Sequence, residues 1–191
     1  MKRLILALAA VSLLAAPAFA QSMGEKTGIN SMIGTAPSTQ DFVTQCAISD
    51  MFEIESSKLA QVNAMDPAIK TFADKMVKDH TTTSNELKAL VSGGKVKAQL
   101  PTEMDSAHKS KLDKLKGLKG ADFDKQYDDD QETAHKNAVS LFERYSKGGD
   151  NADLKAFAAK HLPHLQEHLK MAQDMEPKAS AQTMGAGDKK K

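Results

Sequence analysis

The sequence predicts an all-α protein built as a bundle of four long helices. In four stretches, apolar residues recur at steps of three and four, as they do on the buried face of a helix. No stretch shows the strict alternation of apolar and polar residues that is typical of strands, and aromatic residues, which strands favour, make up only 5% of the chain. Residues 39–176 hold all four stretches, and a segment of this length suits one compact domain.

The first two helices are expected to form a hairpin. The first begins near the Ser-Thr-Gln-Asp segment at 38–41 and continues to about residue 64. The pair Asp66-Pro67 then ends it and starts the second helix, since aspartate is a favoured N-cap and proline a favoured first helical residue. The second helix continues to Gly93-Gly94, where two glycines in succession predict its end.

The connection to the third helix is much longer than a hairpin turn. It spans residues 93–119 and includes a short amphipathic helix with leucines at 112, 115 and 118. The third helix follows over 120–148, and the fourth begins at Asp150 or Asn151 and reaches about residue 175. A long crossover lets the second and third helices run parallel, which predicts the ferritin-like bundle topology.

The first 20 residues are expected to be a Sec-type signal peptide. Lys2 and Arg3 form a positive start, residues 4–16 form a short apolar stretch, and a small-x-small cleavage site ends at Ala20. The chain is therefore predicted to be exported, to the periplasm in a cell that has an outer membrane. Residues 21–38 are expected to form a flexible leader, because they are rich in Gly, Ser, Thr and Met.

The charge balance excludes one class of partner. Without Lys2 and Arg3, the chain has 24 basic and 25 acidic residues, which gives no electrostatic case for nucleic-acid binding. No segment beyond the signal is long and apolar enough for a membrane span. Residues 177–191 are expected to be a disordered basic tail that ends in three lysines. An oligomeric or envelope partner does not follow from the sequence.

A histidine interrupts the apolar stripe of the second helix. Burying an imidazole costs free energy unless it gains a hydrogen bond or a metal ion. His80 is therefore the most informative residue of the chain. The stripe comprises Ile69, Phe72, Met76, His80, Thr83, Leu87 and Leu90.

The helix register places four polar residues at about the same height. Glu53 and His80 lie almost equally far from the first turn, and each helical residue rises by about 1.5 Å, so the two residues should be level. His135 lies about as far before the turn at 148–149 as the histidines of the fourth helix lie after it. All these positions fall near the middle of the bundle.

Two interpretations remain open from the spacing. A glutamate and several imidazoles in a core form a site that suits a divalent transition metal such as Zn, Cu or Fe. Alternatively, Glu53 and His80 form a buried ion pair with a purely structural role, and the other histidines bond to tyrosines or to the backbone. The candidate metal ligands are Glu53, His80, His135 and His168, with His161 and His164 as secondary candidates.

Several segments of the chain resemble a bacterial exported ferritin-like family, domain of unknown function 4142. The most specific are Met-Val-x-Asp-His at 76–80 and Leu-Pro-x-Leu-x-x-His-Leu at 162–169, and the resemblance spans about 40–172. It implies a ferritin-like four-helix bundle in the cell envelope, and it implies no activity, because the family's role is not established. Glu53, His80 and His135, together with His168, fall on polar positions that recur in the family, one on each long helix.

The same residues do not fit a di-iron oxidase. That site needs a Glu-x-x-His pair on two helices and a glutamate on each of the others, and the second helix here carries no such pair. We therefore expect no catalytic residue and no organic cofactor. The predicted function is metal binding without catalysis in the envelope. The alternative is a structural or stress-response bundle.

Overall fold

The computed structural model describes residue 31 and residues 34–175. Its helices are α3 (Thr39–Asn63), α4 (Pro67–Ser92), α5 (Ser106–Lys116), α6 (Gly120–Gly148) and α7 (Ala152–Met175). The described residues contain no strand, so the prediction of an all-α bundle with a short helix in a long crossover is confirmed. The expected signal peptide, most of the expected leader and the basic tail lie outside the described residues.

The helices begin and end where local chemistry predicts. Ser38 and Asp66 cap α3 and α4 by accepting backbone N–H groups of the first turn, and Pro67 is the first residue of α4. Gly94, just after α4, adopts a φ of 75°, which glycine reaches without steric cost. Asn151 accepts the N–H of Leu154 and thereby caps α7.

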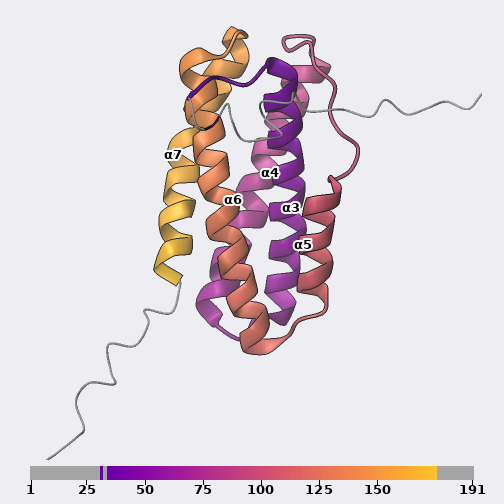
Figure 1. Cartoon of the computed structure of the whole chain (residues 1–191), viewed down its shortest axis with the longest axis vertical. Helices are drawn as coiled ribbons and strands as arrows, with labels where there is room; N and C mark the ends of the chain where they lie inside the picture. Colours follow the sequence, from indigo (N-terminus) through magenta and orange to yellow (C-terminus); the bar gives the residue numbers. More distant parts are fainter. Residues whose placement is uncertain (1–30, 32–33, 176–191) are drawn as a thin grey trace, which may run out of the picture.

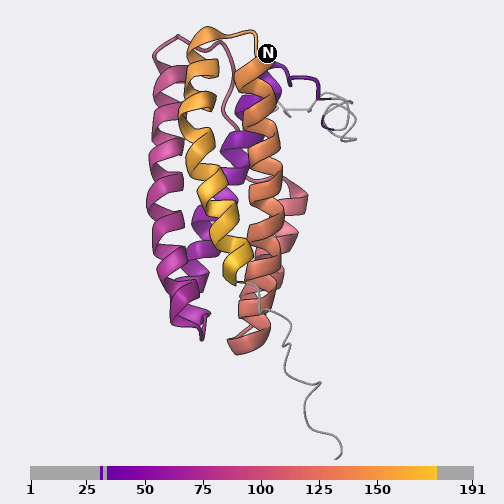
Figure 2. The ribbon, with the colours of Figure 1, turned by 90° about the vertical axis from the view of Figure 1, so that its left-hand side faces the viewer.

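The four long helices of the bundle form two antiparallel hairpins, α3–α4 and α6–α7 (Figure 1). The crossover descends beside α3, with α5 packed against α3 and α6, so that α4 and α6 run in the same direction. Each hairpin also contacts the other, α3 against α6 and α4 against α7. Figure 2 shows α7 lying between α4 and α6 on the side it views. None of the helices in the described part is long and apolar enough to cross a membrane.

Two apolar clusters fill the ends of the bundle, and a polar layer separates them. One cluster gathers around Phe42 and Phe142, and the other around Phe72 and Phe123. The residues between them at mid-height are polar although they are fully or almost fully buried. Polar groups at that depth need hydrogen-bond partners or a bound ion, so this layer is the candidate functional site. The layer includes Asp50, Glu53, Ser56, His80, Gln131, His135 and His168.

Candidate metal centre

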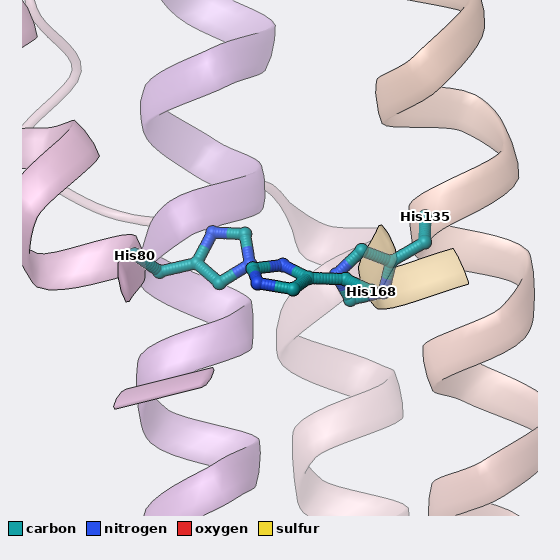
Figure 3. A group of neighbouring side chains, drawn as sticks. All are labelled: His80, His135 and His168. Carbon is teal, nitrogen blue, oxygen red and sulfur yellow. The ribbon is translucent and has the colours of Figure 1, made fainter. Parts of the chain in front are cut away.

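Three histidines from three helices meet in the polar layer. His80 of α4, His135 of α6 and His168 of α7 are 3%, 1% and 2% exposed. Their ring centroids lie 5.4 to 5.6 Å apart, and one ring nitrogen of each lies within 4.8 Å of those of the other two. Figure 3 shows the three imidazoles pointing toward one another from separate helices. Three imidazoles are enough to hold a metal ion, because three histidines form one of the common ligand sets of zinc in proteins.

Carboxylates orient two of the three imidazoles from the outside. The Nδ1 atom of His80 lies 2.8 Å from Asp50 Oδ1, and the Nε2 atom of His168 lies 3.0 Å from Asp79 Oδ2. Asp50 also accepts the hydroxyl proton of Ser84, which holds the carboxylate in place. Because a carboxylate accepts the N–H of the ring nitrogen that faces it, the opposite nitrogen is left to face the cluster.

A backbone carbonyl orients the third imidazole. His135 Nδ1 donates to the carbonyl oxygen of Gln131, 2.9 Å away and one turn earlier in α6. The nitrogen atoms on the inner side, His80 Nε2, His135 Nε2 and His168 Nδ1, are buried and have no hydrogen-bond partner. Three inward nitrogens without partners, each on a ring fixed from its other side, are the arrangement of metal-ligating histidines.

The three imidazoles differ in their affinity for protons. Burial opposes a charge on His80, but the hydrogen bond and charge of Asp50, with help from Glu53, raise its pKa above the usual value. Burial and the charge of His80 lower the pKa of His168 to about 4 and hold that of His135 well below its usual range. The cluster therefore has the electrostatic environment for one positive charge, carried by a proton on His80 or by a cation.

Glu53 of α3 lies beside this cluster without belonging to it. The side chain is 1% exposed, and its carboxylate lies near the amide of Gln131 but makes no hydrogen bond of good geometry. Burial raises its pKa to about 7, and the charge of His80 opposes that rise. A buried glutamate is expensive to ionise unless a positive charge arrives nearby. Each of the four long helices thus supplies one of the residues Glu53, His80, His135 and His168 to the polar layer.

The alternative of a direct Glu53–His80 ion pair does not hold, because the carboxylate that contacts His80 is that of Asp50. Asp50 and His80 lie equally far from residue 65 in the turn, so they are level, whereas Glu53 lies one turn closer to it. The tyrosines do not bond to the histidines either. The hydroxyl of Tyr127 pairs with Ser57 at 2.7 Å, and that of Tyr145 pairs with Thr39 at 2.6 Å.

The two secondary candidates lie outside the cluster. His161 Nε2 pairs with Glu86 Oε2 at 2.9 Å, and its ring packs against Phe157. His164 is exposed on α7. Both line a groove between α4 and α7 that reaches His80 and His168.

The chain belongs to the family described as a domain of unknown function, DUF4142, whose model matches residues 19–175. No curated protein matches the chain. A solved structure described as CopM in the Cu(II)-bound form is similar in fold, with a TM-score of 0.62 and 16% sequence identity. The similarity covers 73% of this chain and 96% of CopM.

Proposed function

We propose that this DUF4142 protein binds one divalent transition-metal ion through His80, His135 and His168, and that Glu53 supplies the fourth ligand. The protein holds the ion and performs no catalysis. The observation that carries the proposal is the set of three buried ring nitrogens that face one another without hydrogen-bond partners. A buried lone pair with no partner costs free energy, and a shared cation removes that cost at all three rings at once.

The charges around the three histidines support a cation rather than a neutral ligand. Asp50 and Asp79 sit behind two of the rings, and the charge of Glu53 also acts on His80. Carboxylates behind the imidazoles increase the basicity of the inner nitrogens and offset the charge of the ion. Asp79 also pairs with Lys75 at 2.8 Å, so part of its charge is already balanced.

Imidazole nitrogens with one carboxylate suit ions of intermediate softness, such as Zn, Cu(II) and Fe. The cluster consists of three histidines and contains no cysteine, a ligand that would favour Cu(I). CopM was solved with Cu(II) and shares the fold, which makes Cu(II) an ion to test alongside zinc. The single nearby glutamate disfavours a di-iron site, which takes most of its ligands from carboxylates.

The proposal is tested with protein recovered from a periplasmic extract, stripped with chelator and reloaded. We expect the chain to begin at Gln21, in accord with export and cleavage after Ala20. We expect one Zn, Cu(II) or Fe(II) ion per chain, and a rise in unfolding free energy of about 2.7 kcal/mol when free metal is 100 times Kd. Loss of both the stoichiometric metal and the stabilisation for all three ions would overturn the proposal.

The Asp50→Asn variant tests the role of the carboxylate behind His80. We expect metal affinity to fall by roughly 10- to 100-fold with the stoichiometry unchanged, because asparagine keeps the shape of the side chain but not its charge. Isothermal titration with zinc measures both quantities. Asp105→Asn is the matched control, because Asp105 also accepts from a histidine, His108, but lies outside the centre as the N-cap of α5. Unchanged affinity in Asp50→Asn would contradict this role.

A structural role is the second candidate, and specific contacts favour it. The Asp50–His80 bond joins α3 to α4, and the Asp79–His168 bond joins α4 to α7, so both fix the helix register. These bonds account for the outer ring nitrogens of His80 and His168. They do not account for the inner nitrogens, which are buried without a hydrogen-bond partner. The reloading experiment separates the two candidates, because a purely structural network gains no stability from a metal.

A further inference from the structure

We infer that the groove between α4 and α7 is the route by which a cation reaches the three buried histidines. The inference rests on the proposed function, since it concerns how the same centre is loaded. The groove has a volume of about 240 Å³. Its lining includes His80 and His168 of the centre and also the exposed side chains of Thr82 and His164. One continuous groove thus connects the protein surface to two of the three histidines.

The packing of the bundle favours this route. The histidines are at most 3% exposed, so an ion needs a passage between helices. Within each hairpin, α3–α4 and α6–α7, the two helices contact each other extensively. In contrast, α4 and α7 belong to different hairpins and contact each other much less. Figure 2 shows these two helices side by side, α4 in magenta and α7 in yellow.

The groove walls carry groups that can accompany a partly dehydrated cation. The imidazole of His164 at the surface, the half-buried carboxylate of Asp79 and the buried hydroxyl of Thr83 offer nitrogen and oxygen atoms. Such ligands replace lost hydration better than an apolar wall does. At one end, Glu86 of α4 accepts from His161 of α7 at 2.9 Å, which holds the two walls together there.

Two substitutions that narrow the groove test the inference. Thr82→Trp narrows it from α4 and His164→Trp from α7, and both positions are exposed, so the fold is expected to tolerate them. We expect zinc loading and chelator-driven zinc release each to slow on the order of tenfold, with Kd unchanged. The rates change together because a residue on the path alters the barrier and not the bound state. Stopped-flow mixing with a coloured zinc chelator measures both rates.

Lys88→Trp is the matched control, because Lys88 lies on the far side of α4, about 160° from Glu86 at about 100° per residue. Its rates should equal those of the unmodified protein. If both groove variants load zinc as fast as Lys88→Trp does, the route is overturned although the centre still binds. A changed Kd with an unchanged loading rate would also overturn it. If the unmodified protein binds no zinc, Cu(II) or Fe(II), the proposed function fails together with the route.

Discussion

Replacing His135 with leucine is expected to abolish the stabilisation by metal while leaving the metal-free protein folded. Removing one of the three proposed imidazole ligands should cost about 3–4 kcal/mol of binding free energy, roughly a 10²- to 10³-fold rise in Kd. The metal-free protein should tolerate the change within about 1 kcal/mol, since the substitution also removes a buried Nε2 atom that has no partner. The carbonyl of Gln131 that accepts from His135 belongs to α6, whose own hydrogen bonds persist.

His135 is the most informative of the three proposed ligands to remove, because its orienting partner is a backbone carbonyl and no carboxylate is left unpaired. Urea unfolding with and without zinc measures both effects in the same preparation. His108→Leu is the matched control, since His108 is a half-buried histidine on α5 that bonds to Asp105. Zinc should stabilise this control as much as it stabilises the unmodified protein. Equal zinc affinity in His135→Leu would exclude His135 as a ligand.

Much of the fold follows from local chemistry in the sequence. The ends of α3 and α4 are set by Ser38, Asp66 and Gly94, which act within a few residues of the chain. Residues equally far from the short turn between α3 and α4 lie at the same height in the bundle, because the rise per helical residue is fixed. The parallel run of α4 and α6 follows from the length of the crossover, and the structure confirms it.

The orienting carboxylates could not be predicted in the same way. Asp79 precedes His80 in the sequence, yet it bonds to His168 on another helix, and no periodic pattern marks that choice. Asp50 and Glu53 are one helical turn apart, about 4.5 Å, so a small error in the position of the turn exchanges them as partners of His80. Such choices depend on the rotation of each helix about its axis, which tertiary packing decides.

Tertiary packing also decides which histidine of α7 joins the cluster with His80 and His135. His161 and His168 are seven residues apart on one flank, so about 10 Å of helix rise separates them and only one can be level with His135. The exact start of α7 after the turn decides which one, and spacing alone leaves this open. The resemblance to the family pointed to His168, and the structure places His168 in the cluster and His161 against Glu86.

Replacing Glu53 with glutamine is expected to change the metal-free and metal-loaded proteins in opposite directions. In the metal-free fold, burial raises the pKa of Glu53 to about 7 from its usual value of 4.5. The folded state therefore holds this proton more tightly than the unfolded state does. The stability associated with it is fully present below pH 4.5 and is lost as the pH rises through 7, by about 3 kcal/mol in total.

Glutamine does not ionise, so Glu53→Gln should escape this loss. From pH 4.5 to pH 8, the unfolding free energy of the metal-free variant should rise by about 2–3 kcal/mol relative to that of the unmodified protein. Urea unfolding in the presence of chelator at several pH values measures the difference. Glu55→Gln is the matched control, because Glu55 lies on the same helix but is exposed and paired with Lys58. An identical pH dependence in Glu53→Gln and the unmodified protein would show that Glu53 is not held protonated by burial.

The metal-loaded protein should respond with the opposite sign. A cation among the three histidines would favour the ionised carboxylate, so the loss of this charge in Glu53→Gln should weaken zinc binding by about 10- to 100-fold at pH 8. Stability of the metal-free protein alone would favour glutamine at position 53. A glutamate that lowers this stability and strengthens ion binding is therefore expected only where ion binding is the function. If zinc affinity is the same in Glu53→Gln and Glu55→Gln, Glu53 is not a ligand and the centre consists of the three histidines.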